Sequence, residues 1–513
     1  MDDTRLRMWR RGALCVGLLF SGACGDSDSG SAERGPGSGN TGVAQPGAQD
    51  NGAFRALIDQ NQIPGPNTLD SVGFFNEHKI ELPDPDCGND VCAHGLLGVM
   101  GNLINGANCT MVMIGLNTPL DPSEVERPPL NLAIAVDTSG SMAGEPIARV
   151  KEGLARMLSA LAPEDRVSLV AFSDSAKVVA GGDNGDFRRF EAAIDRLQAT
   201  GATNLYDGLR SAYDLIEETL DPGRQNRVIL LSDGVATAGV QETARIAELG
   251  RVYADLGIGV STIGLGTDFD ESLLRGLAES GGGTFHFVDN LAAVREIFTE
   301  EVNLTIVPIA QRAQLELEVT DGYELRSIYG TKLAALQFGG ATIDLPNLYI
   351  AHRQDAQDVD GGRRGGGGVI IAELVPEEDS SPLDVGTIAF AYDDPRSGER
   401  VEQEIDIRSP EVDEALLESG YFGGTGVEKS FVALNIYAGF EIAAQSAQAG
   451  DYGRGLVALE SLREGVQDWL RGQSPPDPDI VDDLEYVERL ITLLARHNDL
   501  VRPMTPPNPW PRD

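Results

Sequence analysis

The stretch NLAIAVDTSGSM, residues 131–142, joins an apolar half to a polar half. With Leu130 before it, the apolar half is an uninterrupted run of small and branched side chains, typical of a strand buried on both faces of a parallel sheet. The run ends at Asp137, and Ser139 and Ser141 follow at alternate positions. A loop with this spacing can present one carboxylate and two hydroxyls at a single point, and such hard oxygen donors suit Mg²⁺ and comparable ions. The alternative interpretation is that the aspartate and a serine cap the helix that follows.

Strand-like and helix-like segments alternate after this stretch. Strands are expected at residues 166–172, 227–234, 259–266 and 284–289. Amphipathic segments with helical periodicity are expected at residues 145–161, 186–197, 203–220, 242–256, 270–280 and 291–302. Apolar strands that alternate with amphipathic helices indicate a mostly parallel sheet covered on both faces, so residues 126–303 are predicted to form a doubly wound, Rossmann-like α/β domain.

Two later polar residues stand where this fold would bring them to the same edge of the sheet. Thr203 follows a glycine-rich turn at the head of a helix, and Asp233 ends a buried run in VILLSDG. In open α/β sheets, ligands bind beyond the carboxyl ends of the strands. Taken singly, Thr203 is an ordinary helix cap and Asp233 an ordinary turn residue. Their order after D-x-S-x-S predicts one metal site from Asp137, Ser139, Ser141, Thr203 and Asp233.

Residues 130–303 resemble the von Willebrand factor type A family, because AVDTSGSM, GATNLYDGL, LLSDG and STIGLG stand in the family's order. The resemblance implies a metal-ion-dependent adhesion site on one rim of the sheet. Ser139 and Ser141 would bind the ion directly, and Thr203 would do so when ligand is present. Asp137 and Asp233 would act mostly through water. The ion would be Mg²⁺, Mn²⁺ or Ca²⁺, and an Asp or Glu carboxylate of a protein partner would fill its open position.

Three functions compete for this site. The first is a non-enzymatic binding module for adhesion or envelope assembly. The second is a metal-dependent hydrolase, which needs a general base and an activated water, yet neither H-E-x-x-H nor G-x-S-x-G occurs in the chain. His286, the one histidine within residues 126–303, falls inside an expected strand. The third, a structural surface protein with a vestigial site, is disfavoured because no ligand position is lost. We predict the non-enzymatic binding module.

The N-terminus has the features of an export signal. Arginines within residues 1–12 precede the short apolar run ALCVGLLF and the small residues SGA, and the run is too short to span a bilayer. Ending on Cys24, residues 1–23 resemble a bacterial lipoprotein signal, which implies lipidation of Cys24. Ordinary secretory cleavage is the alternative, because Ser21 stands where that signal usually has an aliphatic residue. The resemblance predicts an exported, lipid-anchored protein of the bacterial cell envelope that faces the periplasm or the cell surface.

Composition narrows the choice of partners. Lys and Arg number 40 against 80 Asp and Glu, which gives a formal charge of −40. Such a chain repels nucleic acid, whose binding needs cationic surface. It also repels anionic lipid, so membrane contact is expected only through the N-terminal anchor.

The segments before the α/β domain are predicted to be a flexible linker at residues 24–52, rich in Gly, Ser and Pro, and a small pre-domain at residues 53–125. In DCGNDVC a tight turn favours a disulfide between Cys87 and Cys92, although pairing through Cys109 stays open. A zinc site made of these three cysteines and His94 is the lesser alternative, because their spacing matches no standard motif.

After the α/β domain, the sequence pattern changes first to that of β-strands and then to that of helices. Residues 304–410 alternate with a period of two, which predicts an antiparallel, sandwich-like β-domain. Within it, GGRRGGGG (residues 361–368) lacks the Lys-Ser/Thr of a phosphate-binding loop and is predicted to be a hairpin tip. Helical periodicity returns at residues 411–500, and residues 501–513 form a Pro-rich tail. This order, with FFNEH at residues 74–78, also resembles bacterial envelope proteins of the same family.

Overall fold

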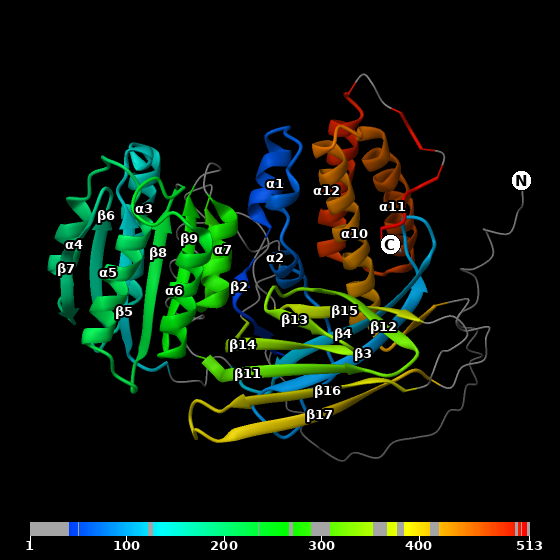
Figure 1. Cartoon of the computed structure of the whole chain (residues 1–513), viewed down its shortest axis with the longest axis horizontal. Coiled ribbons are helices and arrows are strands. Elements are labelled where there is room, and N and C mark those ends of the chain that lie inside the picture. Colours follow the sequence, from blue (N-terminus) through cyan, green and yellow to red (C-terminus); the bar gives the residue numbers. More distant parts are fainter. Residues whose placement is uncertain are drawn as a thin grey trace, which may run out of the picture.

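The computed structural model describes residues 41–49, 51–121, 127–233, 235–265, 270–288, 308–351, 367–376, 384–410, 420–497, 501–503 and 505–509. The predicted signal at residues 1–23, the Cys24 lipidation site, the helix expected at residues 291–302, most of the GGRRGGGG segment and part of the tail lie outside the described residues. Figure 1 shows an α/β unit on one side of the molecule, and an antiparallel sheet region beneath a group of helices on the other.

The sheet of the α/β unit has the strand order β2-β10-β9-β8-β5-β6-β7. Its strands are β2 (Gly47–Ala48), β5 (Leu130–Asp137), β6 (Arg166–Phe172), β7 (Ala176–Asn184), β8 (Gln225–Ser232), β9 (Ile258–Leu265) and β10 (Gly282–Val288). The central strand β5 pairs in parallel with β6 and β8, and every residue in it is buried. Only β7 runs antiparallel to its neighbour.

Helices cover both faces of this sheet. They are α3 (Glu145–Ala160), α4 (Arg188–Asp195), α5 (Leu205–Glu218), α6 (Thr243–Asp255) and α7 (Glu271–Ser280). Ile134 of β5 lies in one core cluster with residues of α3 and α4, whereas Ala135 lies in a second cluster with residues of α5, α6 and α7. Neighbouring side chains of β5 thus face opposite layers, and the predicted doubly wound fold is confirmed.

The second sheet is antiparallel and has the main order β12-β15-β4-β1-β14-β11-β16-β17, with β13 on β14 and with β3 and β18 beyond β4. Its strands are β1 (Thr41–Ala44), β3 (Cys92–Gly101), β4 (Asn108–Thr118), β11 (Pro308–Val319), β12 (Tyr323–Tyr329), β13 (Ala334–Gln337), β14 (Gly340–Ile350), β15 (Val369–Pro376), β16 (Asp384–Asp393), β17 (Arg400–Arg408) and β18 (Tyr421–Phe422). Val112 of β4 shares one core with Leu315 and Phe390, which come from the neighbouring strands β11 and β16, as in the sandwich-like domain expected from the sequence.

The predicted boundary between a pre-domain (residues 53–125) and a β-domain (residues 304–410) is wrong. Strand β4 pairs with β15, with Gly115 opposite Val369, so both segments build one sheet. The α/β unit is therefore an insertion between β4 and β11. Alternation along the chain reveals a strand but not its partner, because pairing depends on residues far apart in sequence.

The predicted linker (residues 24–52) is wrong in its last part. Strand β1 lies between β4 and β14 and is antiparallel to both, while β2 runs parallel to β10 of the other sheet. A composition of small and polar residues suggests a linker, but the edges of two sheets satisfy the backbone hydrogen bonds of this segment. It therefore connects the two units directly.

The remaining helices form a layer against the antiparallel sheet. They are α1 (Gly52–Asp59), α2 (Ser71–Asn76), α10 (Thr425–Gln448), α11 (Tyr452–Gly472) and α12 (Pro478–Leu494), with 3-10 turns η1 (Pro66–Thr68) and η2 (Gly140–Met142) elsewhere. Phe54, Phe74, Phe431, Leu459 and Val487 share their core. Among the described helices, none has both the length and the apolar character needed to cross a membrane.

The FFNEH segment (residues 74–78) holds the helical layer against the N-terminal strands. Asn76 Nδ2 donates to the carbonyl of Ala48 at 2.8 Å, and a Glu77 carboxylate oxygen accepts from the backbone N–H of Asn51 at 3.2 Å. The Nε2 atom of His78 lies 2.7 Å from an Asp483 carboxylate oxygen in α12. All three side chains are buried, so this segment has a structural role.

Candidate metal centre

The site begins where β5 and β8 end side by side. Their parallel register places Val136 opposite Leu231, so Asp137 stands level with Ser232. One oxygen of the Asp137 carboxylate accepts from the Ser232 hydroxyl at 2.7 Å, and the other accepts from the backbone N–H of Ser139 at 2.8 Å. The carboxylate is buried and holds the following loop against the neighbouring strand.

The hydroxyls of that loop face Asp233. Ser139 Oγ and Ser141 Oγ lie 3.0 Å apart, and Ser141 Oγ donates to Asp233 Oδ1 at 2.9 Å. Four of the five predicted residues therefore meet in one hydrogen-bonded cluster, in which Ser139 and Asp233 are buried and Ser141 is exposed to solvent.

Thr203 belongs to a second loop that lies against the first. The backbone N–H of Gly140 donates to the carbonyl of Gly201 at 2.9 Å, and that of Thr200 donates to the carbonyl of Thr138 at 2.7 Å. The Thr203 backbone is held in turn by the Thr237 hydroxyl, which accepts its N–H at 2.9 Å. Among the described contacts, none joins the Thr203 side chain to the other four predicted residues. The loop that carries Thr203 thus lies beside the site, although no described hydrogen bond links the Thr203 side chain to the other predicted residues.

The helix-capping alternative is wrong for these residues. Helix α3 begins after Gly144, whose φ of 88° favours glycine, and no side chain caps it. The N-cap of α5 is Asn204, which accepts from the backbone N–H of Asp207. Ser139 stands at the N-cap position of η2 but makes no side-chain cap hydrogen bond there, and Thr203 is not the cap of α5. Capping therefore uses neither hydroxyl.

The charges of the two neighbouring acids, Asp137 and Asp233, repel each other. Burial raises the pKa of Asp137, although hydrogen bonds from Ser232 and Ser139 oppose this shift. Burial also raises the pKa of Asp233; the hydrogen bond from Ser141 opposes the shift, and the charge of Asp137 adds to it. A cation at the cluster would relieve the repulsion between the two carboxylates.

The donor set fits a hard divalent ion. It combines two carboxylates with three hydroxyls, which are the oxygen ligands that Mg²⁺, Mn²⁺ and Ca²⁺ prefer. In the part of the chain that the structure describes, no cluster of three or more His, Cys, Asp or Glu side chains can hold a metal. The candidate site differs in kind from such a cluster because it depends on hydroxyls.

Ser232 is the one site residue that the sequence analysis missed. Its hydroxyl orients Asp137 at the buried base of the cluster. The available signal was its place at the end of β8, immediately before Asp233.

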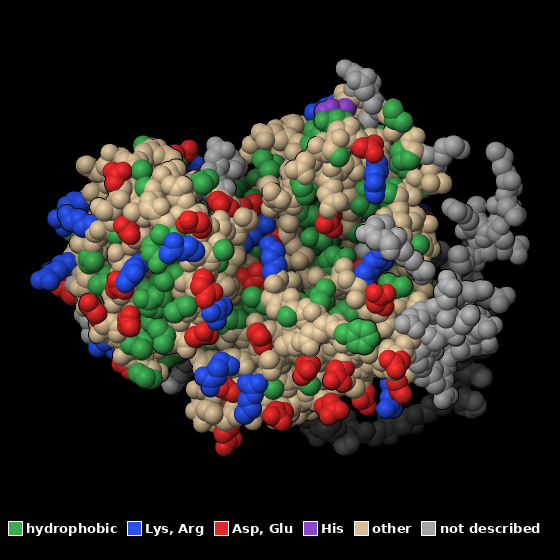
Figure 2. Space-filling view, viewed as in Figure 1, with side chains coloured by type: hydrophobic (Ala, Val, Ile, Leu, Met, Phe, Trp, Pro, Cys, Tyr) green, Lys and Arg blue, Asp and Glu red, His purple; other side chains and the backbone are tan. Residues whose placement is uncertain are grey.

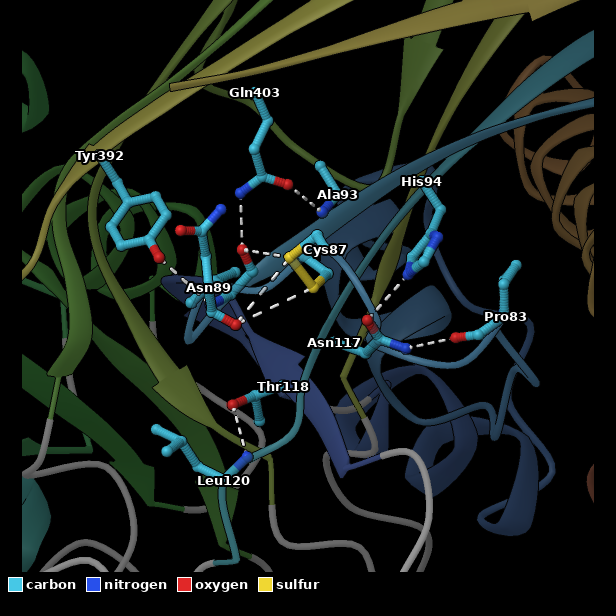
Figure 3. The surroundings of a disulfide bond; sticks show 12 residues. Pro83, Cys87, Asn89, Ala93, His94, Asn117, Thr118, Leu120, Tyr392 and Gln403 are labelled. Carbon is cyan, nitrogen blue, oxygen red and sulfur yellow. Dashed lines mark hydrogen bonds between the residues drawn. A yellow bond between two sulfur atoms is a disulfide. The ribbon is translucent and has the colours of Figure 1, made fainter. Parts of the chain in front are cut away.

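The predicted cysteine pair belongs to the antiparallel sheet region, where Cys92 begins β3. Cys87 and Cys92 form a disulfide, while Cys109 is a buried free thiol, so the zinc alternative is wrong. His94 lies beside Asn117, with 2.8 Å between its Nε2 atom and the amide oxygen (Figure 3). Tyr392 and Gln403 hold the disulfide loop from the opposite side of the sandwich.

The fold and the loop cluster define a doubly wound domain with oxygen donors at its strand tips. Residues 131–300 match the family model of the von Willebrand factor type A domain, and the chain carries a domain of that family. Domains of this family mediate protein interactions and adhesion.

Several known proteins are similar to the chain. It is 28% identical over 301 residues to the uncharacterized protein sll0103 of Synechocystis, covering 53% of this chain and 64% of that protein. It is 27% identical over 220 residues to the uncharacterized protein YfbK of Escherichia coli, covering 40% and 38%. It is 31% identical over 223 residues to human inter-alpha-trypsin inhibitor heavy chain H4, covering 39% and 23%. The chain thus spans less than two thirds of the length of each of these relatives.

The structural likeness extends beyond the α/β unit. A von Willebrand factor type A protein from Catenulispora acidiphila superimposes with a TM-score of 0.50 and 18% identity, covering 81% of this chain and 98% of that chain. At this identity the likeness concerns the fold alone.

Proposed function

We propose that the chain is a non-enzymatic, divalent-metal-dependent binding module of the bacterial cell envelope. Its ion, Mg²⁺ or alternatively Mn²⁺ or Ca²⁺, would clamp an Asp or Glu carboxylate of a partner protein. The observation that carries this proposal is the chain of contacts from the Ser139 hydroxyl to the Ser141 hydroxyl and on to Asp233, beside the buried Asp137.

The arrangement of donors favours a site that attracts a further anion. Both oxygens of Asp137 already accept hydrogen bonds, so this carboxylate is suited to supporting the site from behind. Ser139 and Ser141 would hold the ion directly, with Thr203 joining when a ligand is present and Asp233 acting through water. An ion held mainly by neutral oxygens keeps excess positive charge, and a partner's carboxylate can neutralise it.

The contacts of His286 favour this function over a hydrolase. His286 is buried in β10, and its Nε2 atom lies 3.2 Å from the hydroxyl of Thr284 in the same strand. A general base must reach the reacting group or its water. At 2% exposure this histidine is a packed strand residue, which supports a binding module over a hydrolase.

Metal binding is tested on the full chain by calorimetry with Mg²⁺ and Mn²⁺. Asp137→Ala, Ser139→Ala and Ser141→Ala should each abolish binding, because each removes a ligand or its support. Ser159→Ala is the matched control: it deletes an exposed hydroxyl of α3 that donates to the carbonyl of Arg156. Equal binding by the wild type and the three site variants would refute the metal assignment.

Partner binding is tested by affinity capture with and without a chelator. A partner that is lost on chelation, and is not captured by Ser141→Ala, supports the clamp. Release of hydrolysis products from that partner would favour an enzyme instead.

We also propose lipid anchoring at Cys24, which would place the module at the envelope. Cys24→Ala should move the protein from the membrane fraction to the soluble fraction. An unchanged distribution in cell fractionation would exclude the anchor.

A further inference from the structure

A cavity of about 660 Å³ opens between the α/β unit and the antiparallel sheet region. Its walls come from the first residues of β8 and β9, the end of α6, and strands β11 and β14. The candidate metal centre lies at the opposite end of β8, where Ser232 and Asp233 stand. The cavity is therefore a separate feature of the molecule, and its size falls within the range of small-molecule sites, which often lie between domains.

Basic residues outnumber acidic ones in the lining of this cavity, unlike in the chain as a whole. Acidic residues outnumber basic ones two to one in the sequence, at 80 against 40. The charged residues that line the cavity are four arginines and two aspartates: Arg227, Arg251, Arg312, Arg400, Asp255 and Asp344. Figure 2 shows Lys and Arg side chains gathered near the lower end of α6 and the start of β11.

Acidic neighbours compensate three of these arginines. Arg251 pairs with Glu248 and Asp255, and both Arg312 and Arg400 pair with Asp393. Arg227 is the remaining arginine of the cavity lining, and it takes no part in these ion pairs.

Arg227 is a buried cation with neutral partners. It is 3% exposed; Nη1 donates to the Ser261 hydroxyl at 3.2 Å and Nη2 donates to the Tyr349 hydroxyl. Its guanidinium carbon lies 5.0 Å from the centre of the Tyr349 ring. Among the described residues, no carboxylate forms an ion pair with it. An arginine stays protonated in proteins, and a buried charge is costly unless an opposite charge pairs with it.

Gly259 keeps the space beside Arg227 open. It lines the same cavity, and a Cβ atom there would lie 3.6 Å from Nη2 and 3.7 Å from Nε of Arg227. These are ordinary contact distances, so a side chain at position 259 would not clash with Arg227. It would extend into the cavity. Cavity volume thus adjoins a guanidinium that lacks a counter-ion.

We propose that this cavity binds a small polar molecule carrying a carboxylate or phosphate group, with its oxyanion paired to Arg227. A guanidinium suits this role because its N–H groups match the oxygens of either anion. The amides of Gln225 and Gln311 line the same cavity and can bind the polar remainder of the ligand. Because both units supply walls, the bound molecule would also hold the α/β unit against the antiparallel sheet region.

The test is calorimetric titration of the full chain in metal-free buffer with citrate, inorganic phosphate and, as a neutral probe, glycerol. Citrate or phosphate should bind and glycerol should not, and whichever anion binds identifies the group. Arg227→Gln should weaken anion binding by at least about tenfold, because a charge-assisted hydrogen bond is lost. Arg471→Gln, which removes one exposed positive charge of α11, should bind as the wild type does.

Gly259→Met keeps the test decisive if Arg227→Gln does not fold. It retains every charge and places a side chain beside the Arg227 guanidinium, where the anion would sit, so anion binding should disappear. Ser141→Ala should bind the anion normally, which separates this site from the metal centre. Failure of both anions to bind, or equal binding by wild type, Arg227→Gln and Gly259→Met, would overturn the proposal.

Discussion

Replacing Glu279 with Gln should make the protein more stable above neutral pH. Glu279 lies near the end of α7 and is 3% exposed, where the α/β unit meets the antiparallel sheet region. Its Oε1 atom accepts the backbone N–H of Lys332 at 2.7 Å. Burial raises the pKa of Glu279 to about 7, the charge of Asp70 adds to the shift, and Lys332 and Arg275 oppose it. Gln has the same shape and keeps the acceptor without the charge.

The size of the effect follows from the two pKa values. The ordinary pKa of the carboxyl group is 4.5, so its folded-state pKa of about 7 lies about 2.5 higher. Each pKa unit corresponds to about 1.4 kcal/mol, which gives a maximum of about 3 kcal/mol. The folded state binds the proton more tightly, so stability is greatest below pH 4.5 and falls as the pH rises towards 7. The Glu279→Gln variant avoids this loss.

The assay is urea unfolding of wild type and variant at a series of pH values from about 5 to 8, followed by circular dichroism. The difference in unfolding free energy should be small at the acidic end and should approach about 3 kcal/mol in favour of Gln above pH 7. Glu373, whose pKa burial also raises to about 7, contributes the same trend to both proteins and cancels in the comparison. A difference that is flat with pH, or that grows towards acid, would refute the reasoning.

Three further substitutions test the packing and the covalent link. Phe74→Ala should cost about 3 to 5 kcal/mol in denaturant unfolding, because a buried ring that contacts Tyr437 is removed; a loss below 1 kcal/mol would contradict this. Replacing Cys87 and Cys92 together with Ser should cost about 2 kcal/mol, since the closed loop is short, and an unchanged melting temperature would count against it. Tyr349→Phe should cost about 1 to 3 kcal/mol, because its hydroxyl joins a strand carbonyl to a buried guanidinium; wild-type stability in urea would show that this contact is dispensable.

Much of the candidate metal centre could be predicted because its parts are local. Asp137 and Asp233 each follow an apolar run, and the carboxyl ends of parallel strands meet at one edge of a sheet. Ser139 and Ser141 share a loop with Asp137, so their proximity needs no long-range knowledge. The role of Ser232 could not be predicted from the sequence because it depends on the exact register of β5 against β8.

Residues 41–48 could not be placed from their composition. Their small and polar side chains resemble those of a linker, yet β1 and β2 complete two different sheets. The same difficulty affected β3 and β4, because β18 and β15, with which they pair, lie beyond the inserted α/β unit. Which edges are free to receive a strand depends on the rest of the fold.

The sequence alone was enough for the α/β fold and for the hydroxyl and carboxylate cluster, because hydrophobic periodicity and motif order act over short stretches of chain. Only the three-dimensional structure reveals that β1 and β2 join the two units, that Ser232 supports Asp137, and that Arg227 lies buried without an acidic partner among the described residues. Each of these features depends on contacts between residues distant in sequence. Such contacts are set by packing and strand pairing across the whole fold, which no local pattern records.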